Sequence, residues 1–160
     1  MIDWAIAFVR EVPQLVESAL PGFPDASLKE DGDAGWPIAS YPQPMDPVNL
    51  NQKLSQFTEH WPPCTIAQLN NQDIMVVKAK GEFVWHKHDD TDDFFLVLKG
   101  QLNIELRDRT VAIGPGELFI VPKGVEHRPV ADEEVHLLLI EPTGTPNTGD
   151  PSTAALRRIL

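Results

Sequence analysis

The sequence is poor in cysteine and in basic residues. It has one cysteine, Cys64, so a disulfide within the chain is excluded and a reducing compartment is allowed. Its 13 Lys and Arg face 24 Asp and Glu, which gives a formal net charge of −11. No basic stripe offsets this excess, and an acidic chain repels polyanions such as nucleic acid. We therefore expect no nucleic-acid partner and no binding to anionic membrane surfaces.

Long apolar runs are also missing from the sequence. No stretch approaches the ~20 apolar residues that a membrane-spanning helix needs. The N-terminus lacks the basic start of a signal peptide, and Glu11 and Pro13 interrupt the apolar positions that follow. The 160 residues, 42% of them hydrophobic, suffice for one domain with a core and modest extensions. We expect a soluble, cytoplasmic protein.

Three regions differ in their pattern. Residues 1–47 form an N-terminal extension, in which a helical, proline-broken segment over 1–20 precedes an irregular linker. Its apolar stripe would pack on the main domain or on a second subunit. Residues 48–149 form the main domain. Residues 150–160 form a C-terminal tail, in which we expect one helical turn over 154–158.

In the main domain, apolar residues recur with a period of two. Leu102, Ile104 and Leu106 alternate with polar residues, as in a strand with one buried face. The runs 94–98 and 135–140 are apolar on both faces, as in buried strands. Turn signals that contain glycine separate these runs. Short strands at this spacing, with no alternation with helices, predict an all-β sandwich or barrel.

The histidines are the residues with the clearest chemical pattern. His86 and His88 are two residues apart, and side chains at i and i+2 of a strand point to the same face. Aspartates follow over 89–93, and His127 comes later, after a turn signal. Three imidazoles and a carboxylate suit a divalent ion of Fe, Mn, Ni, Cu or Zn. From spacing alone, a metal-binding pair and a metal-free pair of histidines stay equally open. Two further histidines are interpreted as surface or core residues: His60 and His136.

Two stretches of the main domain resemble the sequence motifs of the cupin superfamily. The first motif has a glycine, His-x-His, an acidic residue and a second glycine, here Gly81, His86, His88, Asp93 and Gly100. The second has two glycines, a proline and a histidine, here Gly116, Pro122, Gly124 and His127. The resemblance covers roughly residues 48–149 and points to small single-domain cupins of the type-2, mannose-6-phosphate isomerase-like kind. We expect the four glycines to occupy turns that need a positive φ or a close approach of the backbone.

The resemblance implies a double-stranded β-helix (jelly-roll) barrel that holds one divalent transition metal, Fe, Mn, Ni or Zn. The family's metal ligands fall on His86, His88, Asp93 and His127. Cupins usually have Glu where this chain has Asp93, so direct coordination, coordination through water and a role in holding a histidine all stay open. The spacing before His86 is one residue short, and Ala131 replaces the usual Asn at the end of the second motif.

Strand alternation also predicts which neighbours of the ligands face the metal. Phe83 and Trp85 alternate with the histidines, so we expect them to pack away from it, whereas Glu82 and Val84 would point to the cavity or its mouth. By the same argument, two residues that share the face of Asp93 would line the pocket: Phe95 and Val97.

Two kinds of function fit this pattern. The first is a metal-dependent enzyme acting on a small polar molecule, with isomerase, oxygenase or lyase chemistry. The alternative is a non-catalytic cupin that binds or senses a small ligand, with the metal as an anchor. The sequence shows no general base and does not select a substrate. We also expect a homodimer, because small cupin barrels leave apolar sheet edges to cover.

Overall fold

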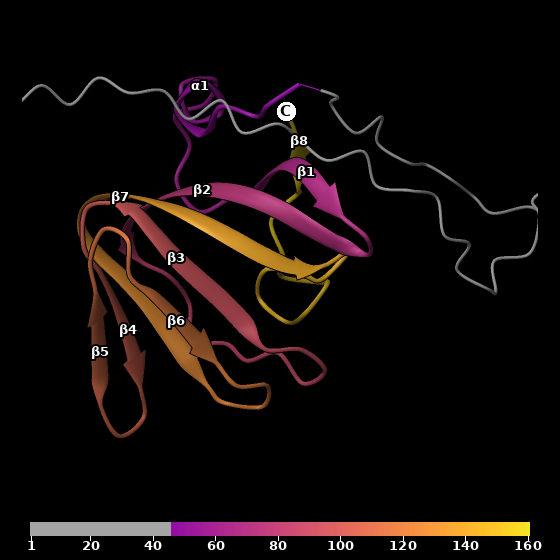
Figure 1. The fold of residues 1–160 in the computed structure, drawn as a ribbon. Helices are drawn as coiled ribbons and strands as arrows, with labels where there is room; N and C mark the ends of the chain where they lie inside the picture. The colour runs from indigo at the N-terminus through magenta and orange to yellow at the C-terminus, as the bar shows by residue number, and fades with distance from the viewer. Residues whose placement is uncertain (1–45) are drawn as a thin grey trace, which may run out of the picture. The chain divides into compact units, whose positions relative to one another are not determined.

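The structure is a computed structural model that describes residues 46–160. The helix and most of the linker expected in the N-terminal extension lie outside the described residues. Within residues 46–160 the chain forms one short helix and eight strands (Figure 1). In chain order they are α1 (Leu50–Leu54), β1 (Cys64–Leu69), β2 (Gln72–Glu82), β3 (Asp93–Lys99), β4 (Leu102–Leu106), β5 (Thr110–Ile113), β6 (Leu118–Val121), β7 (His127–Pro142) and β8 (Arg158–Ile159).

The long strand β7 organises the sheet. Along one edge it pairs with β2 over the whole length of that strand, and along the other edge it pairs with β4 near its start and with β3 further on. The strand order is β5-β4-β7-β2-β1-β8, and β6 pairs with β3. In Figure 1 the strands β3, β6, β4 and β5 swing away from β2 and β7, so the sheet curves around an interior. The all-β prediction is confirmed.

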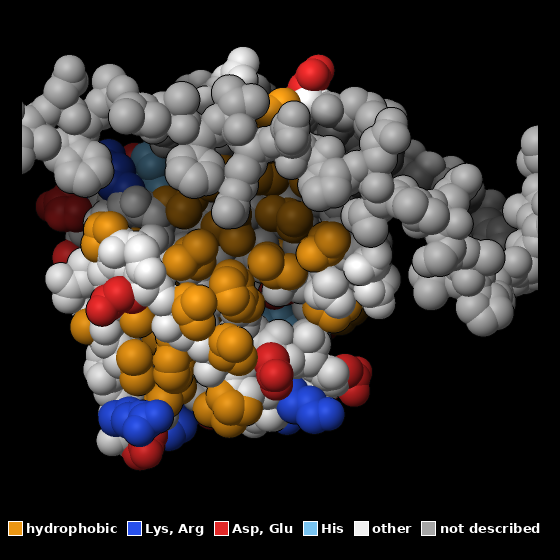
Figure 2. Space-filling view, viewed as in Figure 1, with side chains coloured by type: hydrophobic (Ala, Val, Ile, Leu, Met, Phe, Trp, Pro, Cys, Tyr) orange, Lys and Arg blue, Asp and Glu red, His pale blue; other side chains and the backbone are white. Residues whose placement is uncertain are grey.

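The core lies on the concave side of this sheet. Burial alternates along β3, where Phe95 and Val97 are buried and Phe94 and Leu96 are only half-buried. Inward residues of β2 to β7 form one apolar cluster with this pair: Val77, Ala79, Leu102, Ile104, Ile113, Val121, Ala131, Val135 and Leu137. The sequence pattern suggested strands apolar on both faces, and the outer face is indeed apolar, as the orange surface in Figure 2 shows.

The helix α1 was not predicted. Asn49 caps it, because its side-chain oxygen accepts the N–H of Gln52 at 3.0 Å. Leu54 and Phe57 are buried in a second apolar cluster with residues of β1 and β2. A helix of five residues is too short for its periodicity to be detected in a sequence. Packing rather than propensity stabilises a helix of this length.

The helical turn expected in the C-terminal tail is wrong. Residues 158–159 form β8 instead, which pairs in parallel with β1. The N–H of Arg158 donates to the carbonyl of Pro63 at 3.2 Å, and that of Leu160 donates to Thr65 at 3.0 Å. The free edge of β1 therefore binds the tail by backbone hydrogen bonds, whereas an isolated helical turn of five residues is too short to be stable in water. Among the described residues, no helix has the length and apolar character needed to cross a membrane.

The expected turn glycines are confirmed by their backbone angles. Gly81, Gly100, Gly116 and Gly124 have φ values of 80°, 84°, 82° and 78°. At Gly100, between β3 and β4, a Cβ atom would lie 3.0 Å from the carbonyl oxygen of Glu134. Both the left-handed backbone and the close approach of β7 therefore require glycine at this hairpin.

Candidate metal centre

The segment between β2 and β3 carries His86 and lies against the start of β7. The N–H of His86 donates to the carbonyl of His127 at 3.0 Å, and the N–H of His127 donates back to the carbonyl of His86 at 2.9 Å. Residues paired in this way project their side chains to the same face. The two ring centroids are 4.2 Å apart. The backbone pairing therefore places two imidazoles side by side.

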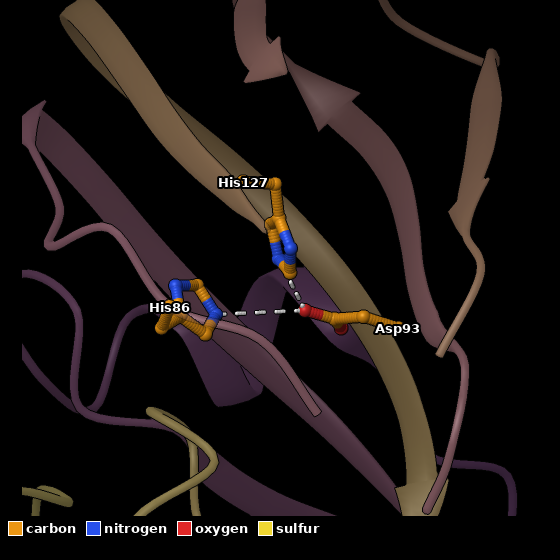
Figure 3. Close-up of side chains that lie close together, drawn as sticks. All are labelled: His86, Asp93 and His127. Carbon is orange, nitrogen blue, oxygen red and sulfur yellow. Dashed lines mark hydrogen bonds and ion pairs between the residues drawn. The ribbon is translucent and has the colours of Figure 1, made fainter. Parts of the chain in front are cut away.

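Asp93, the first residue of β3, faces these histidines. Its Oδ2 atom lies 3.1 Å from Nε2 of His127, 3.5 Å from Nε2 of His88 and 3.8 Å from Nε2 of His86. All four side chains are buried. Figure 3 shows His86 and His127 turning a ring nitrogen toward the same oxygen of Asp93. The structure thus places the three predicted histidines around one carboxylate oxygen. The donor atoms of His86, Asp93 and His127 all lie within 4.8 Å of one another, whereas His88 forms a second such group with Asp93 and Glu141.

Hydrogen bonds fix the rings of His86 and His127. Nδ1 of His86 lies 3.0 Å from the carbonyl of Val84, and Nδ1 of His127 lies 3.0 Å from the carbonyl of Val125. A carbonyl only accepts, so each Nδ1 carries the proton and donates it. In a neutral ring, Nε2 then presents its lone pair toward Asp93, which is the orientation that metal-binding histidines adopt.

The donor atoms of the cluster fit a divalent metal ion. Nε2 of His88 and Oδ1 of Asp93 are buried without a hydrogen-bond partner within residues 46–160. A carboxylate that faces imidazole lone pairs is stable only with a cation among them, either protons on the rings or a metal ion. Three nitrogen donors and one oxygen donor match Fe, Mn, Ni or Zn.

The environment keeps Asp93 ionised. Burial alone would raise the pKa of Asp93, but the interactions with His127, His86 and His88 outweigh burial and hold that pKa well below its usual range. A ligand carboxylate must be deprotonated to bind a metal ion. The cluster therefore supplies this ligand in its binding form.

One acidic residue near the cluster was missed. Glu141, near the end of β7, is buried. The donor atoms of its carboxylate, the carboxylate of Asp93 and the ring of His88 lie within 4.8 Å of one another. Burial, followed by the charge of Asp93, raises the pKa of Glu141 to about 8. The signal was present, because Glu141 continues the alternation of Val135 and Leu137 on the inward face.

The C-terminal tail contacts this acidic residue. The guanidinium of Arg157 donates to Glu141 at 3.4 Å, and also to Asp73 and to the carbonyl of Thr145. Near this point, Gly149 lies against the carbonyl of Lys87, closer than a side chain would allow. The loop before the tail therefore packs against the segment that carries His86 and His88, and the tail itself contacts Glu141 through Arg157.

A pocket opens beside the centre, with a cavity volume of about 40 Å³. Eight of the twelve described residues that line it are apolar, and the four polar ones are His86, Asp93, Glu141 and Asn147. The prediction that Phe95 lines the pocket is confirmed. Val97 is buried in the core and does not line this pocket.

The predicted orientation of Phe83 is wrong. β2 ends at Glu82, and residues 83–85 are not in a strand, so the alternation breaks before His86. Phe83 turns inward and lines the pocket, with its ring 5.2 Å from that of His86. Val84 is 53% exposed, and Glu82 pairs with Arg128 at the surface, so neither lines the pocket.

The prediction for Trp85 agrees with the structure. Its ring faces outward, and the guanidinium carbon of Arg107 lies 3.8 Å from its centroid. The two remaining histidines also lie outside the cluster. His60 and His136 both contact the partly exposed carboxylate of Glu134, at 3.1 Å and 2.9 Å.

A curved, mainly antiparallel sheet with histidines and a carboxylate buried inside it defines the class of β-barrels with a candidate metal site. Comparison with known proteins identifies the family. The cupin domain family model matches residues 73–141. The uncharacterised protein YdbB of Bacillus subtilis (strain 168) is 34% identical over 81 residues, which cover 50% of this chain and 72% of that protein.

Solved structures agree with this family match. A cupin-2 domain containing protein from Shewanella frigidimarina is 47% identical, with a TM-score of 0.59 over 59% of this chain and 93% of its own. Protein NMB1881 from Neisseria meningitidis is 30% identical, with a TM-score of 0.57 over 61% of this chain and 100% of its own. The chain belongs to the cupin superfamily, as a small cupin domain, and has the β-barrel fold of that family.

Proposed function

We propose that this cupin binds one divalent transition metal through His86, His88, Asp93 and His127, and that it acts on a small molecule in the adjoining pocket. The observation that carries the proposal is the convergence of three buried imidazoles on one buried carboxylate, with Nδ1 of two rings held by backbone carbonyls. A bound ion would supply Lewis-acid chemistry, or redox chemistry if it is iron.

The other residues have roles that follow from their positions. The backbone carbonyls of Val84 and Val125 orient the rings of His86 and His127. Binding of a metal ion would therefore require little movement of these two rings. Glu141 is the only buried acid of the described residues that lines the pocket besides Asp93. It can hold or transfer a proton at its carboxylate, which supports a catalytic role over a non-catalytic binding role.

The metal content of the protein, purified without added metal, tests the proposal. We expect about one ion per chain in the wild type, and the identity of the metal follows from the same elemental analysis. His88→Ala and His127→Ala should lose most of the ion, because each removes a donor from the cluster. The matched control is His136→Ala, which alters a half-buried histidine outside the cluster.

Retention of wild-type metal content in both His88→Ala and His127→Ala would contradict the proposal. The histidines would then be packing residues, and only the fold assignment would remain. Loss of metal in His136→Ala as well would mean that the substitutions act through unfolding rather than through the cluster.

We also propose that the chain forms a homodimer through the outer face of β3 and β6. Leu118 and Ile120 of β6 are 55% and 46% exposed, and they pair with Leu96 and Phe94 of β3. Such a continuous apolar surface is typical of subunit interfaces. Light scattering should give twice the chain mass for the wild type and the chain mass for Ile120→Lys. A monomeric wild type would exclude the dimer. A cytoplasmic location stays a prediction.

A further inference from the structure

The walls of the pocket beside the candidate metal centre are built from aromatic rings. The rings of Trp61 and Phe83 lie with their centroids 5.0 Å apart at an interplanar angle of 33°, and Phe83 meets His86 edge to face at 86°. Phe95 lines the same pocket from β3. The three aromatic walls come from three separate segments of the chain, so the fold brings them together around one space.

The backbone holds Trp61 in a conformation that bulky residues rarely adopt. Its φ is 79°, in the left-handed region. Its main-chain N–H donates to the carbonyl of Lys78 at 2.7 Å, and its indole N–H donates to the carbonyl of Lys80 at 2.9 Å. Both donors of Trp61 are therefore satisfied by β2, and the residue offers the pocket its apolar ring rather than a hydrogen bond.

The polar lining of the pocket is small and includes two residues of the metal cluster, His86 and Asp93. His86, Asp93 and Glu141 are buried, and Asn147 is the fourth polar residue. None of the described residues that line the pocket is Lys or Arg. The guanidinium of the nearby Arg157 is already paired with carboxylates and a carbonyl of the protein.

We infer that the pocket binds a small molecule with a flat, mainly apolar body and one polar end, and that this polar end faces the metal cluster. The inference rests on the proposed function, because it takes the cluster as the metal site. A sugar or a sugar phosphate would place hydroxyl or phosphate groups against rings that offer no partner, and each unpaired polar group lowers affinity. Phosphate recognition also calls for Arg or Lys, which this lining lacks.

Binding of three probe molecules tests the inference. The probes are benzyl alcohol, which has an apolar body and one hydroxyl, and xylose and glycerol 3-phosphate, which do not. Each is titrated into ¹⁵N-labelled full-length protein, both loaded with zinc and free of metal, and followed by NMR. We expect benzyl alcohol to shift the indole N–H signal of Trp61 saturably. The indole signal of Trp85, which stacks outside on Arg107, should stay in place.

Two phenylalanine variants separate the pocket from a general effect on the fold. Phe83→Ala removes a wall of the pocket and should weaken benzyl alcohol binding at least fivefold. Phe94→Ala removes a ring of the same size from the outer face of β3 and should leave the affinity unchanged. Saturable binding of xylose or glycerol 3-phosphate that is tighter than that of benzyl alcohol would overturn the inference. So would the absence of benzyl alcohol binding, or equal affinities in Phe83→Ala and wild type.

The zinc content of each sample distinguishes this inference from the proposed function. If zinc binds and benzyl alcohol does not, the metal proposal stands and the ligand class is wrong. If zinc fails to bind while benzyl alcohol still shifts Trp61, the metal proposal fails and the preference of the pocket for an apolar body is retained.

Discussion

Two buried aspartates of the sheet, Asp73 in β2 and Asp93 at the start of β3, have opposite surroundings. Each is almost fully buried, at 3% and 4% exposure. The carboxylate of Asp73 accepts from Gln68 at 2.9 Å, from Thr143 at 3.1 Å and from the guanidinium of Arg157. The protein therefore supplies its own cation and donors at this site, which is typical of a structural ion pair.

Asp93 has no such cation of the protein's own. Its neighbours are imidazoles, and its Oδ1 atom has no hydrogen-bond partner among the described residues. A buried carboxylate of this kind needs a cation from solvent, either protons on the rings or a metal ion. Burial alone therefore does not distinguish an aspartate in a structural ion pair from an aspartate in a binding site. The source of the neighbouring cation does distinguish them.

The largest predicted effect is on the free energy of unfolding when each of these two aspartates is replaced, measured with and without zinc. Asp73→Asn should lower the free energy of unfolding by about 3 kcal/mol, with or without zinc, because it removes the closer of the two buried carboxylates that pair with Arg157. Asp93→Asn should abolish the additional stability that zinc gives the wild type, because binding to the folded state alone stabilises it. Urea unfolding of both variants, with excess zinc and with a chelator, measures these differences.

A single outcome would remove the contrast between the two sites. If zinc stabilised Asp93→Asn as strongly as the wild type, Asp93 would not be a ligand, and the ion would have to bind through the histidines alone. Asp93→Glu is the matched variant, because it restores the acid that cupins usually have at this position. It should retain the zinc effect if a longer side chain is accommodated.

The sequence was informative where local pattern decides the structure, and less so where distant segments meet. The spacing of His86 and His88 and the motif around His127 predicted residues that the structure brings together. Phe83 was misplaced because strand alternation was extended past the end of β2. The position of Arg157 depends on the pairing of β8 with β1, which a two-residue strand cannot signal in a sequence.

Glu141 lies between the two aspartate sites, and its titration should show this. Burial and the charge of Asp93 raise the pKa of Glu141 to about 8 from an ordinary value of 4.5. Between these values the folded state holds a proton that the unfolded state has released, so the free energy of unfolding falls as the pH rises. Metal-free wild type should lose on the order of a few kcal/mol relative to Glu141→Gln across this range.

Thermal or urea unfolding of the metal-free proteins at several pH values checks this expectation. Glu133→Gln is the control, because the side chain of Glu133 is 91% exposed and its removal should not change the pH profile. Parallel profiles for wild type and Glu141→Gln would show that Glu141 titrates normally, and that Arg157 offsets its burial more fully than the distances indicate.

The smallest predicted effect comes from a carboxylate that is also flanked by histidines, but at the surface. Glu134 accepts from His136 at 2.9 Å and from His60 at 3.1 Å, and these contacts lower the pKa of Glu134 to about 2. A depressed acidic pKa contributes stability above the unfolded value of 4.5, and this contribution is lost as the pH falls toward 2. Because the side chain is 37% exposed, water and salt screen the interaction, and Glu134→Gln should cost less than about 1 kcal/mol at neutral pH.

Unfolding at low and high salt, with metal analysis of the same samples, measures the stability and the metal content of Glu134→Gln. Metal content should equal that of the wild type, since the two histidines around Glu134 lie outside the metal cluster and the carboxylate between them is 37% exposed. A loss of zinc in Glu134→Gln comparable to that in Asp93→Asn would show that the histidines around Glu134, and not burial of the cluster, control metal binding.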